Sequence, residues 1–174
     1  SENVSISGTH INLPEGFMLD LGGIAKGYAA EKVKEKLVGM GIKSAIISLG
    51  GNVQTIGKKP GGDKWKIGIA DPFGDESSES IYAEDSAVVT SGGYQRNFTH
   101  EGKTYHHIID PKTGYPAESG IASVTVICES GTEADALSTA FFVMGKDKTE
   151  QFCSNHEGIS AVIIMQNGEV INAK

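Results

Sequence analysis

Cysteine is scarce in this 174-residue sequence, and long apolar runs are absent. The two cysteines, Cys128 and Cys153, are too few for a disulfide framework. One lies in an apolar run and the other in a predicted helix, so we expect two free thiols. No run is long enough to span a bilayer, and no signal peptide is visible. The chain starts at Ser1 without methionine, which predicts a processed or trimmed piece, so the missing signal is no argument for a cytosolic location.

Positive charge is also in short supply. The 15 Lys and Arg residues face 22 Asp and Glu, a net charge of −7, and no basic stripe exists to neutralise a phosphate backbone. This excludes a general nucleic-acid binder, so any anionic ligand must be met locally by a lysine, by glycine amides or by a cation. A hydrophobic content of 39% and 23 glycines predict a turn-rich globular chain, long enough for a single domain.

The most informative stretch runs from Asp20 to Glu31, where an apolar segment leads through two glycines into a helix. We expect this helix over residues 23–40, closed by Gly41. Its apolar residues recur at steps of three and four, the spacing of one buried face. They are Ala29, Ala30, Val33, Leu37 and Met40. On its solvent side we expect two ion pairs, Glu31 with Lys34 and Lys32 with Glu35.

The start of this helix is a candidate anion site. First-turn amides lack intrahelical acceptors and carry the positive end of the helix dipole, and Gly22 and Gly23 leave the backbone open to a phosphate. Lys26 lies one turn further on, and Asp20 offers an acceptor for a metal, a hydroxyl or an amide. An ordinary strand-to-helix turn with a solvated Lys26 explains the same residues. The dinucleotide fingerprint and the P-loop pattern both fail to match.

The remaining elements alternate without a strict βαβ order. This favours an α+β fold with an antiparallel sheet layer covered by helices. We expect strands near residues 4–6, in a segment that ends at 20, and near 44–49 (buried), 65–69, 81–84, 87–90 and 121–128. Two hairpins are expected, one of 95–99 with 103–109 and one of 160–165 with 169–172. A connector is expected at 73–80, and further helices over 131–144 and 147–155.

Asp135 and Thr139 are four residues apart in a predicted helix, so both side chains project from one face. They are candidate oxygen ligands for a cation. The alternative is structural, with Thr132 as the N-cap and Asp135 closing a capping box. Sequence reasoning alone leaves both interpretations open.

Two neighbouring histidines, His106 and His107, lie on a predicted strand and must point to opposite faces, so at most one serves a given site. A strand histidine is most often a hydrogen-bonded structural residue, but a neutral imidazole can also carry a proton in catalysis. Asp110, before Pro111, is expected to form an Asx turn.

Ser91 lacks the nucleophile elbow of a hydrolase. A hydroxyl beside the Gly92 amide is better suited to hold a nucleotide phosphate or ribose. Asn52, after two glycines, either contacts the same ligand or supplies a left-handed turn residue.

Five motifs together resemble the ApbE family, the FAD:protein FMN transferases. In chain order they read DLGGIAKGYA (20–29), SLGGN (48–52), TSGGY (90–94), HIIDPKTG (107–114) and EADALSTA (133–140). The family is usually about twice this long. The resemblance therefore implies that residues 1–174 are a portion of a T-fold-type ApbE domain, without the N-terminal half that forms much of the flavin-ring pocket.

The resemblance also implies roles for individual residues. Mg²⁺ would be held by Asp135, Thr139 and the carbonyl of Gly23, a set of hard oxygen donors that suits this ion. His107 matches the catalytic histidine, with Lys26 and Asp135 as further catalytic residues. The expected FAD contacts are Gly22, Gly23, Asn52, Ser91, Gly92 and His107.

The activity implied is transfer of FMN from FAD to a threonine hydroxyl of an acceptor flavoprotein, with release of AMP. The acceptors would be flavin-carrying subunits of membrane redox complexes, and the location periplasmic or extracytoplasmic, on a membrane anchor. Three alternatives remain: hydrolysis of FAD to FMN and AMP, a non-catalytic FAD-binding protein, and a half-domain completed by the missing N-terminal half or by a second copy.

Overall fold

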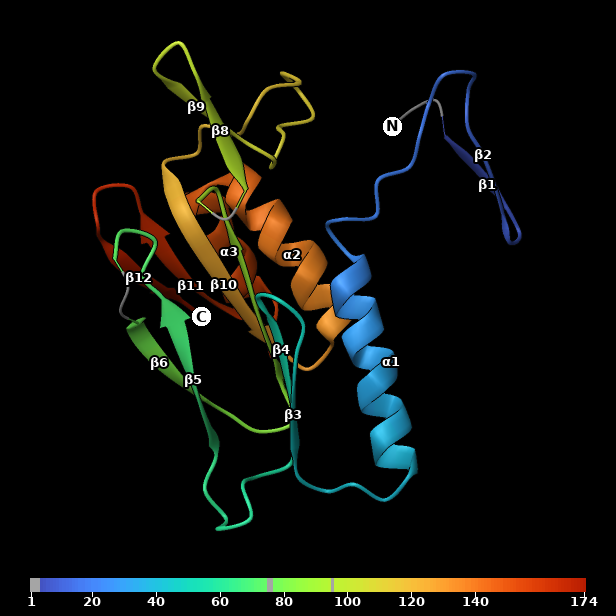
Figure 1. Ribbon diagram of the computed structural model, residues 1–174, viewed down its shortest axis with the longest axis vertical. Coiled ribbons are helices and arrows are strands. Elements are labelled where there is room, and N and C mark those ends of the chain that lie inside the picture. The colour runs from blue at the N-terminus through green and yellow to red at the C-terminus, as the bar shows by residue number, and fades with distance from the viewer. Residues whose placement is uncertain (1–3, 75–76, 95) are drawn as a thin grey trace.

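The centre of the molecule is a six-stranded, fully antiparallel sheet. The computed structural model describes residues 4–74, 77–94 and 96–174. Within the sheet the strands follow the order β12-β11-β10-β7-β4-β3 (Figure 1). Their bounds are β3 Ala45–Ser48, β4 Asn52–Ile56, β7 Ala87–Gly92, β10 Ile121–Cys128, β11 Ser160–Met165 and β12 Val170–Ala173.

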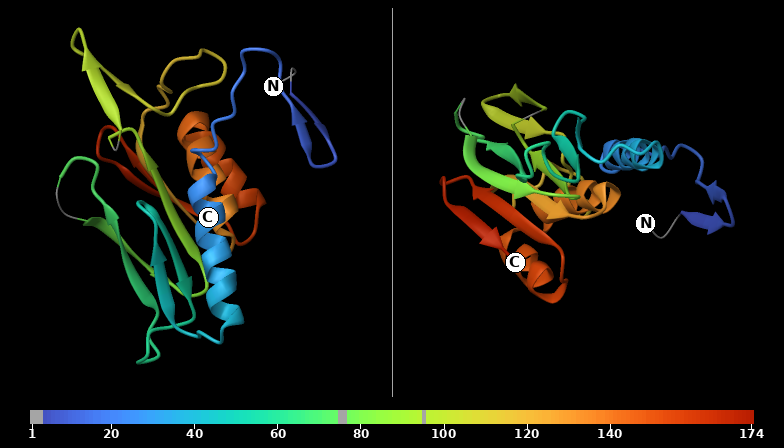
Figure 2. Two further views of the ribbon diagram at one scale, coloured as in Figure 1. Left: turned by 45° about the vertical axis from the view of Figure 1, so that its right-hand side comes forward. Right: turned by 90° about the horizontal axis from the view of Figure 1, so that it is seen from below.

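Helices cover one face of this sheet and a hairpin covers the other. The helices are α1 (Ala25–Gly39), α2 (Gly131–Met144) and α3 (Lys146–Asn155), and the hairpin pairs β5 (Trp65–Ala70) with β6 (Ser77–Ala83) (Figure 2). Because strand side chains alternate, Val89 and Val126 pack into the core under the helices, while Val88 packs with Ile67 of β5. Strand β10 is covered on both faces: six of its eight residues are buried, and two of these, Ser123 and Thr125, are polar.

The expected fold class is confirmed, and so are several elements. Helix α2 begins and ends at the expected residues, α3 starts one residue earlier, and β11 and β12 form the expected hairpin. β8 (Asn97–His100) pairs with β9 (Lys103–His106) through a turn at Glu101 and Gly102, both at positive φ. β9 ends three residues earlier than expected, so His107 lies just beyond the strand and not on it. Residue 95, the expected start of that hairpin, lies outside the described residues, as do 75 and 76 of the expected connector.

Other expectations were wrong. The strand at 45–48 is an edge strand with Ile46 47% exposed, because nothing covers its outer side in the described chain. Strand β4 was missed, since its polar residues broke the apolar pattern. The early hairpin pairs β1 (Ser5–Ser7) with β2 (His10–Asn12), so no strand leads into Asp20. The expected connector at 73–80 ends early, because residues 77–80 belong to β6.

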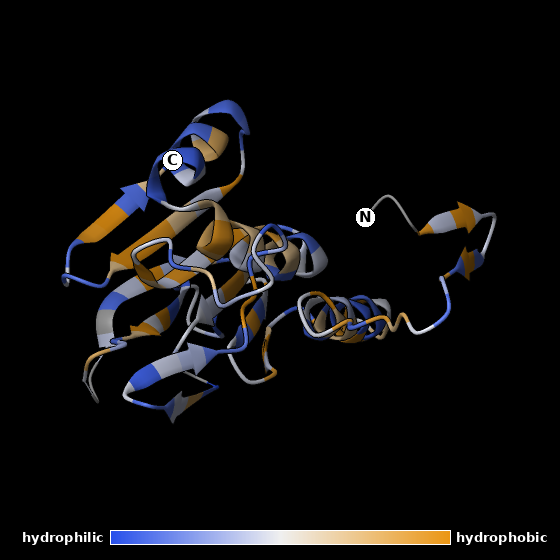
Figure 3. Cartoon of the chain, turned by 90° about the horizontal axis from the view of Figure 1, so that it is seen from above, coloured by the Kyte–Doolittle hydropathy of each residue, from blue (hydrophilic) through white to orange (hydrophobic). Residues whose placement is uncertain are grey.

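The predicted buried face of α1 is only partly buried. Ala30 is fully enclosed and Leu37 half-buried, whereas Ala29, Val33 and Met40 are exposed. The glycine side of the helix contacts the body of the molecule instead, with Gly27 buried. Before α1, the β1–β2 hairpin stands away from the body, and the segment that joins it to α1 has apolar stretches next to hydrophilic ones (Figure 3). Exposed side chains there are Phe17, Met18, Leu19 and Leu21.

Both cysteines are buried free thiols, as expected. Burial, followed by repulsion from Glu133, raises the pKa of the Cys128 thiol to about 11. In the described part of the chain no helix is long and apolar enough to cross a membrane.

Candidate functional site

Helices α1 and α2 meet backbone to backbone at two glycines. A Cβ added to Gly27 would lie 2.2 Å from the Gly131 carbonyl oxygen and 2.6 Å from Asp135 Cβ. A Cβ on Gly131 would lie 1.7 Å from Gln54 Nε2 on β4. Only residues without side chains permit so close an approach. The glycine-rich stretch that begins at Asp20 is thereby brought against the helix that carries Asp135 and Thr139.

Asp135 is 4% exposed and is bonded to the other helix. Its Oδ2 accepts the Gly27 N–H at 2.7 Å. Its other carboxylate oxygen receives no hydrogen bond from the part of the chain that the structure describes. The capping box is wrong, because the N-cap of α2 is Ser130, whose hydroxyl accepts from the Glu133 amide. Asp135 therefore acts between helices, and one of its oxygens remains available for a ligand.

Hydroxyl groups gather around Asp135. Ser91, on the helix-facing side of β7, hydrogen-bonds Ser138 at 2.8 Å and Thr139 at 3.4 Å. Ser138 also donates to the Asp135 carbonyl at 2.9 Å. Gly23 lies next to these hydroxyls, since a Cβ there would lie 3.5 Å from Thr139 Oγ1. Gly23, Thr139 and Asp135, three candidate ligands from distant parts of the sequence, are thus brought together with Ser91.

These donors suit a hard cation. Across the described residues, no three His, Cys, Asp or Glu side chains lie close enough to hold a metal. A metal site here must therefore combine one carboxylate with hydroxyl and backbone oxygens, the ligand type that Mg²⁺ accepts while it keeps waters or phosphate oxygens. Asp135, Thr139 and the Gly23 backbone form such a set.

Two buried amides lie beneath α1. Gln54 Nε2 donates to the Gly27 carbonyl at 3.3 Å. Asn52, two residues earlier on the same face of β4, is 0% exposed, and neither its Nδ2 nor its Oδ1 has a partner in the described chain. A buried amide without partners is energetically unfavourable unless water or a ligand satisfies it. Asn52 lies in a regular strand, so the left-handed turn alternative is wrong.

The helix start differs in part from the expected anion site. The Gly22 amide is already bound, because it donates to Asp20 Oδ1 at 2.7 Å. Lys26 is not simply solvated, since its ammonium donates to the Gly50 carbonyl at 3.1 Å. That bond ties the first turn of α1 to the loop just before Asn52.

The two histidines have different environments. His106 is half-buried: its Nδ1 accepts the Ile108 amide, so Nε2 carries the proton that it donates to the Ala117 carbonyl at 3.2 Å. Its ring packs edge-on against Phe142. His107 is exposed, and its Nδ1 lies 3.2 Å from the Arg96 carbonyl, an acceptor that places the proton on Nδ1. The Nε2 of His107 then carries a lone pair, to which no residue of the described chain donates.

Rings cover the glycines of the TSGGY motif. A Cβ on Gly92 would lie 2.5 Å from the Tyr94 ring, and one on Gly93 would lie 2.9 Å from the His106 ring. Tyr94 and His106, with Lys103 and Phe142, line a hollow of about 870 Å³ whose lining does not include Asp135 or Thr139. Asp110 forms the expected Asx turn, with its Oδ1 accepting the Lys112 amide at 2.8 Å.

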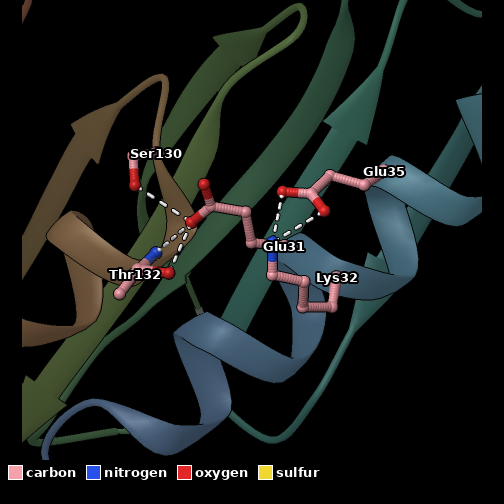
Figure 4. A network of polar contacts seen from close by, with 5 residues as sticks. All are labelled: Glu31, Lys32, Glu35, Ser130 and Thr132. Atoms are coloured by element: carbon pink, nitrogen blue, oxygen red, sulfur yellow. Dashed lines mark hydrogen bonds and ion pairs between the residues drawn. The ribbon is translucent and has the colours of Figure 1, made fainter. Parts of the chain in front are cut away.

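Sequence reasoning missed three residues of this region: Gly27, Gln54 and Glu31. Glu31 does not pair with Lys34 but accepts hydrogen bonds from α2 (Figure 4). The pair of Lys32 with Glu35 is confirmed at 2.8 Å. The one available signal was that Gly27 is a glycine inside a helix, which indicates a close backbone contact.

Comparisons with known proteins identify the family of this chain. A sequence model of the ApbE family matches residues 2–163. The FAD:protein FMN transferases of Treponema pallidum (strain Nichols) and Klebsiella pneumoniae (strain 342) are 38% and 39% identical over 96% and 90% of this chain. The crystal structure of the ApbE protein of Thermotoga maritima is 40% identical, with a TM-score of 0.90 over 99% of this chain. The chain spans about half the length of the curated relatives it matches, 49% and 48%. It belongs to the ApbE family.

Proposed function

We propose that this chain carries the metal-, phosphate- and proton-handling groups of an FAD:protein FMN transferase. The observation that carries the proposal is the convergence of Asp135, Thr139 and the Gly23 backbone with Ser91. The proposed reaction transfers FMN from FAD to a threonine hydroxyl of an acceptor flavoprotein and releases AMP. The names of the relatives support the flavin transfer.

Asp135, Thr139 and the Gly23 carbonyl would hold Mg²⁺, which when bound would neutralise charge on the pyrophosphate oxygens. Asn52 and Ser91 would then hydrogen-bond the phosphate or ribose of FAD. This use satisfies the Asn52 amide, which has no partner in the described chain. Lys26 lies close by, bound to the Gly50 carbonyl, and would turn to the developing negative charge. Two of the proposed contacts are already engaged in this structure, because the Gly22 amide donates to Asp20 Oδ1 and the Tyr94 ring packs against Gly92.

His107 would act as the general base. The bond from Nδ1 to the Arg96 carbonyl orients the ring and leaves Nε2 to take the proton of the acceptor hydroxyl. As that oxygen bonds to the FMN phosphorus, the bond to the bridging oxygen breaks, and AMP leaves with it. We further propose that the acceptors are flavin-carrying subunits of membrane redox complexes and that the reaction is extracytoplasmic, with the protein anchored to a membrane, as the family resemblance implies.

We also propose that the apolar segment before α1 packs against further protein, either the N-terminal half present in longer family members or a second copy. In support, Met18 is 92% exposed and Leu21 58% exposed. Contiguous exposed apolar side chains of this kind are typical of a contact surface.

One experiment tests the proposed reaction. The protein is incubated with FAD and Mg²⁺, with and without an acceptor flavoprotein, and both AMP and protein-bound flavin fluorescence are followed. AMP formed only with the acceptor, together with a flavin-labelled acceptor, supports the transferase. AMP without acceptor supports a pyrophosphatase instead, and FAD binding without AMP supports a carrier.

A further inference from the structure

Glu31 reaches out of its own helix to the N-terminus of another. Its Oε2 accepts three hydrogen bonds: from Ser130 Oγ at 3.0 Å, from the Thr132 amide at 2.8 Å and from Thr132 Oγ1 at 2.5 Å (Figure 4). These bonds, that from the Thr132 hydroxyl foremost, lower the pKa of the Glu31 carboxyl below its ordinary value against the opposing effect of burial. Glu31 is therefore a carboxylate held at the positive end of the α2 dipole.

Asp135 makes the reverse connection. It lies on α2, one turn after Thr132, and accepts the amide of Gly27 in the first turn of α1. Glu31 in turn lies one turn after Gly27. Each helix thus has a first-turn amide bound by a carboxylate of the other helix. The two bonds lie on adjacent turns of an antiparallel helix pair.

Between these two bonds the helices touch through Gly27 and Gly131. A glycine contact allows close approach, but it has no side chains that interlock and fix how far one helix slides along the other. The hydrogen bonds that cross the contact therefore help to set this register, together with the bonds of Lys26 and Gln54 that hold α1 to the sheet. Gly23, which precedes α1 by two residues, moves with the start of the helix.

We infer that Glu31 is a positioning residue. It fixes the register of α1 on α2, so that the Gly23 backbone lies opposite Thr139 and the Gly27 amide reaches Asp135. As far as it concerns the metal, this inference rests on the proposed function. The register itself does not, and it can be measured separately.

The test compares E31A, E31Q and the control E35Q; among the described residues, the Glu35 carboxylate pairs only with Lys32, on the helix surface. Hydrogen exchange of the Gly27 amide, followed by NMR, reports the register, and calorimetric titration with Mg²⁺ reports the metal site. We expect E31A to exchange the Gly27 amide at least about 10-fold faster and to weaken Mg²⁺ binding by about 10- to 100-fold, the usual effect of removing a group that orients a metal ligand. E31Q keeps an acceptor oxygen, so it should keep most of the protection of the Gly27 amide and most of the Mg²⁺ affinity. E35Q should change neither.

Several outcomes overturn the inference. One is a Gly27 amide that stays protected in E31A. Another is an equal loss of Mg²⁺ affinity in E31Q and E35Q, which would make net charge the cause. If E31A does not fold, T132V removes one of the three donors to Glu31 and should give a smaller effect in the same direction. A wild-type chain that binds no Mg²⁺ would refute the proposed metal site, and Gly27 exchange would still decide the register.

Discussion

Replacing Gly27 by alanine tests the helix contact most directly. The new Cβ would lie 2.2 Å from the Gly131 carbonyl oxygen, which is backbone and cannot swing aside. To restore ordinary contact, α1 and α2 must separate by roughly 1 Å, and overpacking of this kind costs about 1–3 kcal/mol. The separation also breaks the charge-assisted bond from the Gly27 amide to Asp135, which contributes about 1.5–3 kcal/mol. The higher helix propensity of alanine offsets about 1 kcal/mol of this loss in the free energy of unfolding.

The net expectation is that G27A lowers the free energy of unfolding by about 1.5–5 kcal/mol. Gly39 offers a matched control in the same helix, because a Cβ there meets nothing within 4 Å. G39A should leave stability unchanged or raise it by up to about 1 kcal/mol. Urea unfolding followed by circular dichroism measures both variants. Equal stability of G27A and G39A would refute the close backbone contact and with it the geometry of the site.

Four further expectations can be checked with standard assays. D135N keeps the shape of the side chain but removes its charge, so turnover should disappear while the circular dichroism spectrum is kept; unchanged AMP release at limiting Mg²⁺ would exclude Asp135 as a ligand. H107A should reduce transfer by roughly 10²–10⁴-fold with little effect on FAD binding, whereas H106A should mainly lower the melting temperature, because His106 is packed and hydrogen-bonded; identical behaviour of the two would contradict this division. The raised pKa of Cys128 keeps its thiol protonated in the folded state, so the free energy of unfolding should fall between pH 9.0, the ordinary pKa of the thiol, and about pH 11. Unfolding of C128A, measured over the same pH range, should show a smaller fall. Finally, only 7% of the residues are aromatic, so this chain alone should bind FAD weakly with its flavin ring exposed, and strongly quenched flavin fluorescence would argue against it.

Much of the molecule follows from local sequence patterns. Helix α2 was predicted to the residue because its apolar period is regular, although its N-cap is Ser130 and not the expected Thr132. The β11–β12 hairpin was predicted because Asn167 and Gly168 form a turn between two apolar runs. The motifs pointed to the family and to the residues of the candidate site. For these features neighbouring residues carry the information, since periodicity, capping and turn chemistry act over a few positions.

The rest depends on contacts between distant segments, which no local pattern contains. The polar strand β4 exists because it pairs with β7 and extends beneath α1, where Gln54 meets the Gly27 carbonyl. Glu31 had two partners within reach, Lys34 on its own helix and the amides of α2. In the folded chain Glu31 binds α2, because a carboxylate is stabilised more by several donors at a helix N-terminus than by one exposed lysine. The sequence by itself pointed to Gly23, Asp135 and Thr139, and only the packing of α1 against α2 at two glycines brought them together.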